Sequence, residues 1–364
     1  MRIILTFIFS FLSSILIAQN GAFIPTKSYR AHKINTKLII DGLAKEEVWS
    51  QAEWTDNFID IEGSKKTRPY YQTKVKMLWD TEYLYFYAEL EEPAIWANLT
   101  ERDAVIFYDN DFEIFIDPDG DTHNYHELEI NAFNTVWDLL LTRAYRDAGH
   151  ALNNWNLKGL KTAISLDGTI NNPSDKDIGW SVEIAIPWTA LSEGTKSKTP
   201  PLEGDMWRIN FSRVQWQTEV IDGKYVKKKD AVTGNRLAEH NWVWSPQRVI
   251  AMHEPEFWGR VYFTNDSSIV NDVVESDYID DTEQARQMIY NIHRAQIQYR
   301  NVNKRYTSRK KFIINYTKTK RLKSFKWQLS ANGQTYWASL KEHNSDNTYW
   351  NIDHTGKIWK EIRK

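Results

Sequence analysis

Carboxylate side chains are concentrated between Tyr108 and Asp138, in a segment that reads YDNDFEIFIDPDGDTHNYHELEINAFNTVWD. Within it Glu113, Glu127 and Glu129 alternate with apolar residues, which predicts that they project from one face of neighbouring strands. Like charges on neighbouring strands repel each other, so this face requires a cation, a positive side chain or a polar ligand. Glycosidases place two carboxylates across the scissile bond, so one hypothesis is a glycoside hydrolase that uses these three residues.

A second acidic group lies in the turn Asp117-Pro118-Asp119-Gly120-Asp121. Carboxylate oxygens are ligands that suit calcium, so these alternating positions predict a metal site. The segment is not an EF-hand loop, because Thr122 and Leu128 stand where that loop needs Gly and Glu. A calcium site that includes Asp111, and a solvated turn without metal, are the alternatives.

The acidic turn is expected to join two β-strands. Phe112, Ile114 and Ile116 precede it at alternate positions, and Leu128 and Ile130 follow it in the same way. Because successive side chains of a strand point to opposite faces, these residues form one apolar face and the carboxylates form the other. The sequence therefore predicts an antiparallel pair around a turn.

Short segments of this kind occupy most of the chain up to residue 265. They lie at 73–79, 83–90, 179–186, 206–215, 242–249 and 258–263. Many short strands with little helix predict an all-β fold, an antiparallel, jelly-roll-like sandwich over residues 34–265. Short helical turns are expected around Trp49 and at Trp188–Leu191.

Aromatic residues are frequent, with 17 Trp, 18 Tyr and 15 Phe. Some indole rings are expected to be exposed, where they would suit the flat faces of sugars; the alternative is that a large sandwich buries them. The formal net charge of −2 gives no bias toward nucleic acid, and no nucleic-acid partner is predicted. The chain has no Cys, which excludes thiol catalysis, disulfides and a lipoprotein anchor.

The first 18 residues, MRIILTFIFSFLSSILIA, combine a basic residue, an apolar run and a small residue before Gln19. This pattern predicts a secretory signal peptide, and the run is short for a membrane-spanning helix. Residues 19–33 are expected to be a lead-in linker, and no transmembrane segment is predicted after them. The mature protein is therefore expected to be periplasmic or extracellular.

The character of the chain changes in residues 272–364. Asp281 is a predicted N-cap, with Gln284 three residues later, for an amphipathic helix of roughly twenty residues. A basic segment follows at 304–326, and then a β-hairpin-like piece. This C-terminal unit allows a further hypothesis, a structural surface protein whose basic unit binds an acidic polymer or another protein.

Several pieces together resemble the family 9 carbohydrate-binding modules. They are Ile40-Asp41-Gly42 with Trp49, Leu78-Trp79-Asp80-Thr81-Glu82-Tyr83-Leu84-Tyr85, Asp111-Phe112-Glu113-Ile114-Phe115-Ile116-Asp117, Gly179-Trp180-Ser181-Val182-Glu183, Ile186-Pro187-Trp188, and Trp207-Arg208-Ile209-Asn210-Phe211-Ser212-Arg213. The resemblance covers roughly residues 34–265. It implies a sugar-binding β-sandwich, structural calcium, and an association of many members with xylan-degrading enzymes.

The resemblance also implies site residues. The family holds a sugar between two Trp rings, while polar side chains fix the hydroxyl groups. Trp96 matches the first ring by position. Asn210 matches the polar residue before the second ring, but Arg213 stands three residues later where that ring is expected, and Trp216 is the nearest ring. The implied carbohydrate-binding residues are Trp96, Glu101, Glu127, Asn131, Asn210, Arg213 and Trp216, and the candidate calcium ligands are Asp111, Asp117, Asp119 and Asp121. The sequence therefore favours an exported, non-catalytic protein that binds plant-type or other polysaccharides, or their oligosaccharides, in polysaccharide catabolism.

Overall fold

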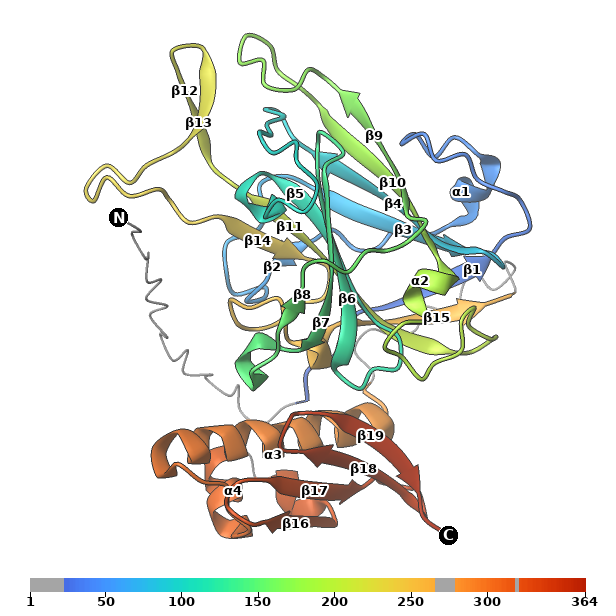
Figure 1. The fold of residues 1–364 in the computed structure, drawn as a ribbon, viewed down its shortest axis with the longest axis vertical. Helices are drawn as coiled ribbons and strands as arrows, with labels where there is room; N and C mark the ends of the chain where they lie inside the picture. Colours follow the sequence, from blue (N-terminus) through green and yellow to red (C-terminus); the bar gives the residue numbers. More distant parts are fainter. Residues whose placement is uncertain (1–22, 266–278, 318–320) are drawn as a thin grey trace.

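The computed structural model describes residues 23–265, 279–317 and 321–364. The predicted signal peptide at residues 1–18 lies outside these ranges. Two units are visible: a large curled β-sheet, and a C-terminal unit in which helices pack on a small sheet (Figure 1). No helix within the described ranges combines the length and apolar character needed to cross a membrane.

The large unit is one sheet that curls until its two halves face each other. Its strands are β1 (Ser28–Lys33), β2 (Ile59–Asp60), β3 (Thr73–Trp79), β4 (Tyr83–Glu91), β5 (Asp111–Asp117), β6 (His123–Asn131), β7 (Val136–Arg143), β8 (Ala151–Leu152), β9 (Lys161–Asp167), β10 (Gly179–Pro187), β11 (Met206–Gln215), β14 (His240–Val243) and β15 (Gly259–Thr264). They run in the order β8-β7-β6-β5-β11-β15-β1-β3-β4-β10-β9, with β14 beside β11 and β2 beside β14. The predicted all-β sandwich is confirmed.

Strand β1 corrects the prediction of a lead-in linker over residues 19–33. It lies inside the sheet and pairs in parallel with β15 and with β3, whereas the other neighbours in the sheet are antiparallel. Tyr29 and Ala31 of β1 are buried, and the Tyr29 hydroxyl donates to the Glu53 carbonyl at 2.6 Å. The sequence did not reveal this strand because its partners lie far away in the chain.

Aromatic rings fill the interior between the two halves. Trp79, Trp188, Trp207 and Phe263 pack edge to face, with ring centroids 5.2–6.2 Å apart. Most tryptophans are buried, and among the described residues Trp359 alone is exposed, at 36%. The expectation of several exposed indole rings is therefore wrong, because this large sandwich uses indoles as core residues.

Short elements decorate the sheet. They are the helices α1 (Glu47–Gln51) and α2 (Trp188–Leu191), the 3-10 turns η1 (Ile106–Tyr108), η2 (Tyr145–Asp147) and η3 (Pro255–Phe257), and the strands β12 (Thr218–Ile221) and β13 (Lys224–Lys227). Both predicted helical turns are confirmed. Strands β12 and β13 form a hairpin that projects from the sheet (Figure 1). Its turn, Asp222-Gly223, has φ values of 50° and 72°, and an Asp-Gly pair is typical of such a tight turn.

The C-terminal unit has its own apolar core. Its elements are α3 (Asp281–Asn303), α4 (Lys310–Thr317), η4 (Arg321–Ser324), β16 (Trp327–Ala331), β17 (Tyr336–Lys341), β18 (Thr348–Asp353) and β19 (Ile358–Ile362). The predicted helix is confirmed, but its N-cap is Asp280, which accepts from the Glu283 amide at 2.7 Å, and not Asp281. The expected hairpin is part of a four-stranded antiparallel sheet.

Buried charges join the two units. Arg208 of β11 forms an ion pair with Glu283 of α3, and both side chains are almost fully buried. Arg286, one turn further along α3, donates to the Gly120 carbonyl at 2.6 Å. Four more charged residues meet at the same boundary: Arg146, Glu254, Glu256 and Arg294. The C-terminal helix therefore depends on the sandwich for the partners of its charges.

We expect Glu283→Ala to lower the free energy of unfolding by about 3–5 kcal/mol, because it leaves Arg208 buried without its partner. Burial alone would raise the pKa of Glu283, but Arg208 and Arg286 outweigh burial and hold it below its usual value. This stabilisation is therefore present at neutral pH and lost as the carboxylate is protonated in acid. Urea unfolding of the full chain measures the effect.

The matched control is Glu62→Ala, which removes an exposed ion pair with Lys66 and is expected to cost less than about 1 kcal/mol. Equal unfolding midpoints for the two variants would contradict a stabilising role for the buried pair.

Candidate functional site

The carboxylate face of β5 and β6 forms as the alternation predicts. Glu113 lies opposite Glu129 in the antiparallel register, and Asp111 lies opposite Asn131. This face is buried, however: the exposed fractions are 0% for Asp111, 5% for Glu113 and 2% for Glu129. A second apolar cluster around Phe115 and the η1 turn cover it, so these carboxylates do not face solvent.

Burial changes the proton affinity of this face. It raises the pKa of Glu113 to about 7, and burial together with the neighbouring carboxylates raises the pKa of Asp111, Glu127 and Glu129 well above the ordinary range. The ligand oxygens of Asp111, Glu113 and Glu129 all lie within 4.8 Å of one another, and two unit charges at that distance repel by about 3 kcal/mol at an effective dielectric constant of about 20. The face is therefore stable only with added protons or an added cation.

The hydrolase hypothesis for Glu113, Glu127 and Glu129 requires that a glycosidic bond reach the carboxyl groups. None of the three side chains is more than 5% exposed. In this conformation a polysaccharide has no route to them, which weighs against catalysis by this group.

Trp96 and Trp216 come together, although neither is open to solvent. They form a small apolar cluster with Val214, packed against Phe107 and Tyr225, and we call these five residues the Trp96–Trp216 cluster. Trp96 is 4% exposed and Trp216 is 9% exposed. The implied pairing of the two rings thus exists, but as a covered contact.

Lys227 of β13 covers this cluster. Its ammonium nitrogen lies 3.3 Å from the centre of the Trp216 ring, 5.7 Å from that of Trp96 and 5.6 Å from that of Tyr108. A cation over aromatic faces is favourable. Burial, followed by the nearby Arg236, lowers the pKa of Lys227 to about 8. The projecting hairpin therefore places a positively charged group over the face of the Trp216 ring.

Two implied sugar-binding amides are structural. Asn131 is fully buried, donates to the Leu99 carbonyl at 2.8 Å and accepts from the Thr135 amide at 3.1 Å. Asn210 is also fully buried and exchanges two hydrogen bonds with the backbone of Ser245, at 2.8 and 2.9 Å. Their side chains hold loops in place and are not available to ligand hydroxyl groups.

Arg213 is likewise internal, and Glu101 is not. Arg213 is 1% exposed, forms an ion pair with Glu92 at 2.8 Å and lies over the Trp242 ring. Glu101 is exposed on the turn that follows the Trp96 loop. Of the polar residues implied as sugar ligands, only Glu101 is open to solvent, since Glu127 is buried with the other carboxylates.

The predicted metal ligands fall into two separate groups. Oxygens of Asp117, Asp119 and Asp121 lie within 4.8 Å of one another, whereas Asp111 groups with Glu113 and Glu129. In the turn, Asp117 Oδ1 is buried and has no hydrogen-bond partner among the described residues, as a metal ligand would.

The other oxygens of the turn already have partners. Asp119 Oδ2 accepts from the Lys196 amide at 2.9 Å, and Asp121 Oδ2 pairs with Lys357 Nζ of the C-terminal unit at 2.7 Å. Carboxylate oxygens have more than one lone pair, so the turn residues fit a calcium ion that would share them with these donors.

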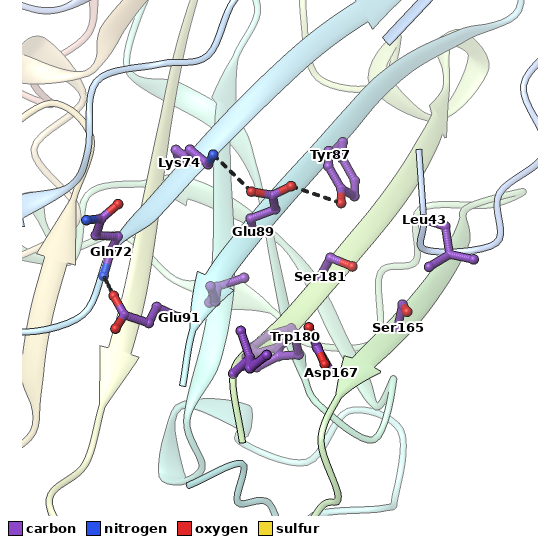
Figure 2. A pocket seen from close by; sticks show the side chains of 13 residues that line it. Leu43, Gln72, Lys74, Tyr87, Glu89, Glu91, Ser165, Asp167, Trp180 and Ser181 are labelled. Atoms are coloured by element: carbon purple, nitrogen blue, oxygen red, sulfur yellow. Dashed lines mark hydrogen bonds and ion pairs between the residues drawn. The ribbon is translucent and has the colours of Figure 1, made fainter. Parts of the chain in front are cut away.

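A second candidate surface lies on the outer face of β3, β4 and β10. It is a groove of about 560 Å³, within the range of ligand pockets (Figure 2). Lys74 forms an ion pair with Glu89 at 3.0 Å, and the Tyr87 hydroxyl donates to Glu89 at 3.3 Å. The backbone amide of Gln72 donates to the Glu91 carboxylate at 3.1 Å. Its polar groups are largely paired with one another.

The sequence did not identify Lys227, Tyr108 or the groove. The sequence does contain one feature that indicates the hairpin carrying Lys227. Asp222-Gly223 lies between two alternating segments, a pattern that is typical of a β-hairpin. No local pattern could show that this hairpin folds back over Trp216.

The indole signal of Trp216 should report the ionisation of Lys227. We expect the ¹⁵N–¹H indole resonance of Trp216 to shift with a midpoint near the lysine pKa of about 8, because the charge leaves the ring face above that pH. Lys227→Met should abolish this titration. Lys224→Met, an exposed residue of the same hairpin, is the control and should leave it unchanged. A pH-independent signal in the wild-type protein would contradict this placement of Lys227.

Comparison with known proteins places the chain in a family. Residues 40–266 match the model of the family described as "Carbohydrate family 9 binding domain-like". No curated protein matches the chain.

Three solved structures are similar to the chain in fold. One is a candidate carbohydrate-binding protein from Bacteroides uniformis, with 19% identity, 65% of this chain and 99% of that chain covered, and a TM-score of 0.47. The others are family 9 carbohydrate-binding modules from Caldicellulosiruptor kristjanssonii. The complex with cellotriose has 17% identity, covers 66% of this chain and 96% of that one, and has a TM-score of 0.41. The complex with glucose has 18% identity, covers 67% and 100%, and has a TM-score of 0.41. The assignment rests on the family model, which spans most of the sandwich: the chain belongs to the carbohydrate family 9 binding domain-like family.

Proposed function

We propose that this protein binds carbohydrate at the Trp96–Trp216 cluster, with Tyr108 and Lys227 at its rim. The observation that carries the proposal is the pairing of two Trp rings at one place in a chain that belongs to this family. Aromatic rings offer flat apolar surfaces that match the C–H faces of a pyranose, while adjacent polar groups select hydroxyl geometry. Tyr108, which is 53% exposed, marks the open side of the cluster.

Access requires a movement of Lys227. Its side chain occupies the face of Trp216, so a sugar that stacks there displaces the ammonium group. The displaced ammonium has three donors and can then bond the hydroxyl groups of the sugar. Strands β12 and β13 contact the sheet less than the core strands do, as the exposure of Val220 and Ile221 indicates, and a rotation of this hairpin is the simplest way to open the cluster.

The proposal extends to calcium and to location. Asp117, Asp119 and Asp121 would hold a structural calcium ion that fixes the turn between β5 and β6. Residues 1–18 would direct export, so that the mature protein works in the periplasm or outside the cell, in polysaccharide catabolism with xylan as one candidate ligand. Removal of the first 18 residues from the protein recovered outside the cytoplasm, read by N-terminal sequencing, tests export.

Trp216→Ala should weaken glycan binding by about 2 kcal/mol, roughly a thirty-fold increase in Kd, because an aromatic anchor is lost. Calorimetry with xylo-oligosaccharides and cello-oligosaccharides measures the effect, and melting curves confirm that the variant is folded. Trp359→Ala, at the exposed indole of the C-terminal unit, is the control and should bind as the wild-type protein does.

An unchanged Kd for Trp216→Ala, together with weaker binding by Lys74→Ala, would move the sugar site to the groove in Figure 2. No binding of any tested glycan by the wild-type protein would refute the proposed function.

A further inference from the structure

Three buried carboxylates lie close together on the face of β5 and β6, and two of them accept hydrogen bonds from residues of the Trp96–Trp216 cluster. Asp111, Glu113 and Glu129 each place an oxygen within 4.8 Å of the other two. Asp111 Oδ2 is fully buried and has no hydrogen-bond partner among the described residues, and the same is true of Glu127 Oε2 on the same face. No lysine or arginine of the described ranges forms an ion pair with any of the four. A buried polar atom without a partner is costly, and here it points toward other acceptors.

We propose that Asp111, Glu113 and Glu129 bind a divalent cation of the calcium class, at a site distinct from the Asp117–Asp121 turn. Calcium takes oxygen ligands at about 2.3–2.6 Å, so two ligands on opposite sides of the ion lie about 4.6–5.2 Å apart. The oxygens of the three carboxylates lie within 4.8 Å of one another, so they are close enough to share one such ion. Three carboxylates also supply the charge that compensates the loss of the hydration shell of the ion.

The strands and backbone hydrogen bonds around the proposed site hold its carboxylates in fixed positions, as metal ligands require. Asp111 and Glu113 lie on β5 and Glu129 lies opposite Glu113 on β6, so the antiparallel register sets their separation. Asp111 Oδ1 accepts from the Val214 amide at 3.0 Å, and Glu129 Oε2 accepts from the Phe107 amide at 3.0 Å. Each of these carboxylates therefore has one oxygen held by the backbone while the second is available to an ion.

These backbone contacts lead directly to the proposed sugar site. The Phe107 carbonyl accepts from Trp216 Nε1 at 2.9 Å, so Glu129 is connected to the Trp216 ring through a single residue. Asp111 holds Val214, two residues before Trp216 on the same segment. A cation that fixes Asp111 and Glu129 therefore fixes the position of Trp216. This second step rests on the proposed function: glycan affinity is expected to depend on the cation.

Cation binding is tested first, without any glycan. The full chain is stripped with a chelator and titrated with Ca²⁺ and with Tb³⁺, whose luminescence is sensitised by nearby tryptophans. Glu129→Gln should lose one equivalent of bound ion relative to the wild type, and Asp111→Asn should lose the same equivalent. Asp119→Asn, in the separate turn, should lose a different equivalent, so Asp119→Asn combined with Glu129→Gln should lose two, whereas Asp111→Asn combined with Glu129→Gln should lose one.

Melting curves distinguish a lost ligand from a damaged fold. In chelator, Glu129→Gln should melt at least as high as the wild type, because the amide cannot carry the negative charge that burial beside Asp111 and Glu113 disfavours. In Ca²⁺ the order should reverse. The proposed cation site would be overturned if Glu129→Gln and Asp111→Asn both bound as many equivalents of the ion as the wild type, with unchanged affinity.

Glycan binding is tested second, on the wild-type chain. Titration with xylo-oligosaccharides and cello-oligosaccharides should give at least ten-fold weaker binding in chelator than in Ca²⁺, and Asp119→Asn should keep most of that dependence. Equal glycan affinity in chelator and in Ca²⁺, when the ion titrations show that the cation binds, would refute the link to Trp216 but not the cation site. Absence of glycan binding under both conditions would refute the proposed function, while the ion titrations still decide the site.

Discussion

The structure depends on the pairing of β5 with β6, which brings four carboxyl groups together on a face that the fold then buries. Burying one charge is expensive, and burying several of the same sign without a counter-charge is more so. The strands nevertheless pair in full register, because Phe112, Ile114, Leu128 and Ile130 on the opposite face supply core contacts. The apolar face therefore stabilises the arrangement that creates the electrostatic cost on the other face.

The carboxylates that carry this electrostatic cost lie next to the proposed sugar site. The loop after Trp96 is held by Asp109, whose carboxylate accepts from the Asn98 and Leu99 amides at 2.8 Å. Asp111 accepts from the amide of Val214, two residues before Trp216, and Glu129 accepts from the amide of Phe107, whose carbonyl accepts from the Trp216 indole. The two aromatic rings are thus positioned by carboxylates of a single strand pair and its lead-in turn, and whatever neutralises those carboxylates also orders the rings.

Charge also explains why the C-terminal unit stays attached. Its helix α3 buries apolar residues against its own small sheet, while Glu283, Arg286 and Arg294 face the sandwich. Lys357 reaches the acidic turn from the same side. Buried ion pairs and the contact of Lys357 with the acidic turn hold the C-terminal unit against the sandwich. The C-terminal unit is therefore a continuation of the sandwich and not a flexible attachment.

The sequence alone determined the fold class, the β5–β6 pair with its acidic turn, and the long C-terminal helix, because periodicity of apolar residues directly reflects which face of a strand or helix is buried. It also identified the family through motifs spread along the chain. Only the tertiary structure decided that Asn131, Asn210 and Arg213 are internal, that the indoles form the core, and that Lys227 covers Trp216. These facts depend on contacts between residues far apart in the chain, and burial of that kind leaves no local pattern. For the same reason, the convergence of Asp111, Glu113 and Glu129 became visible only when the register of the strands and the cover above them were known.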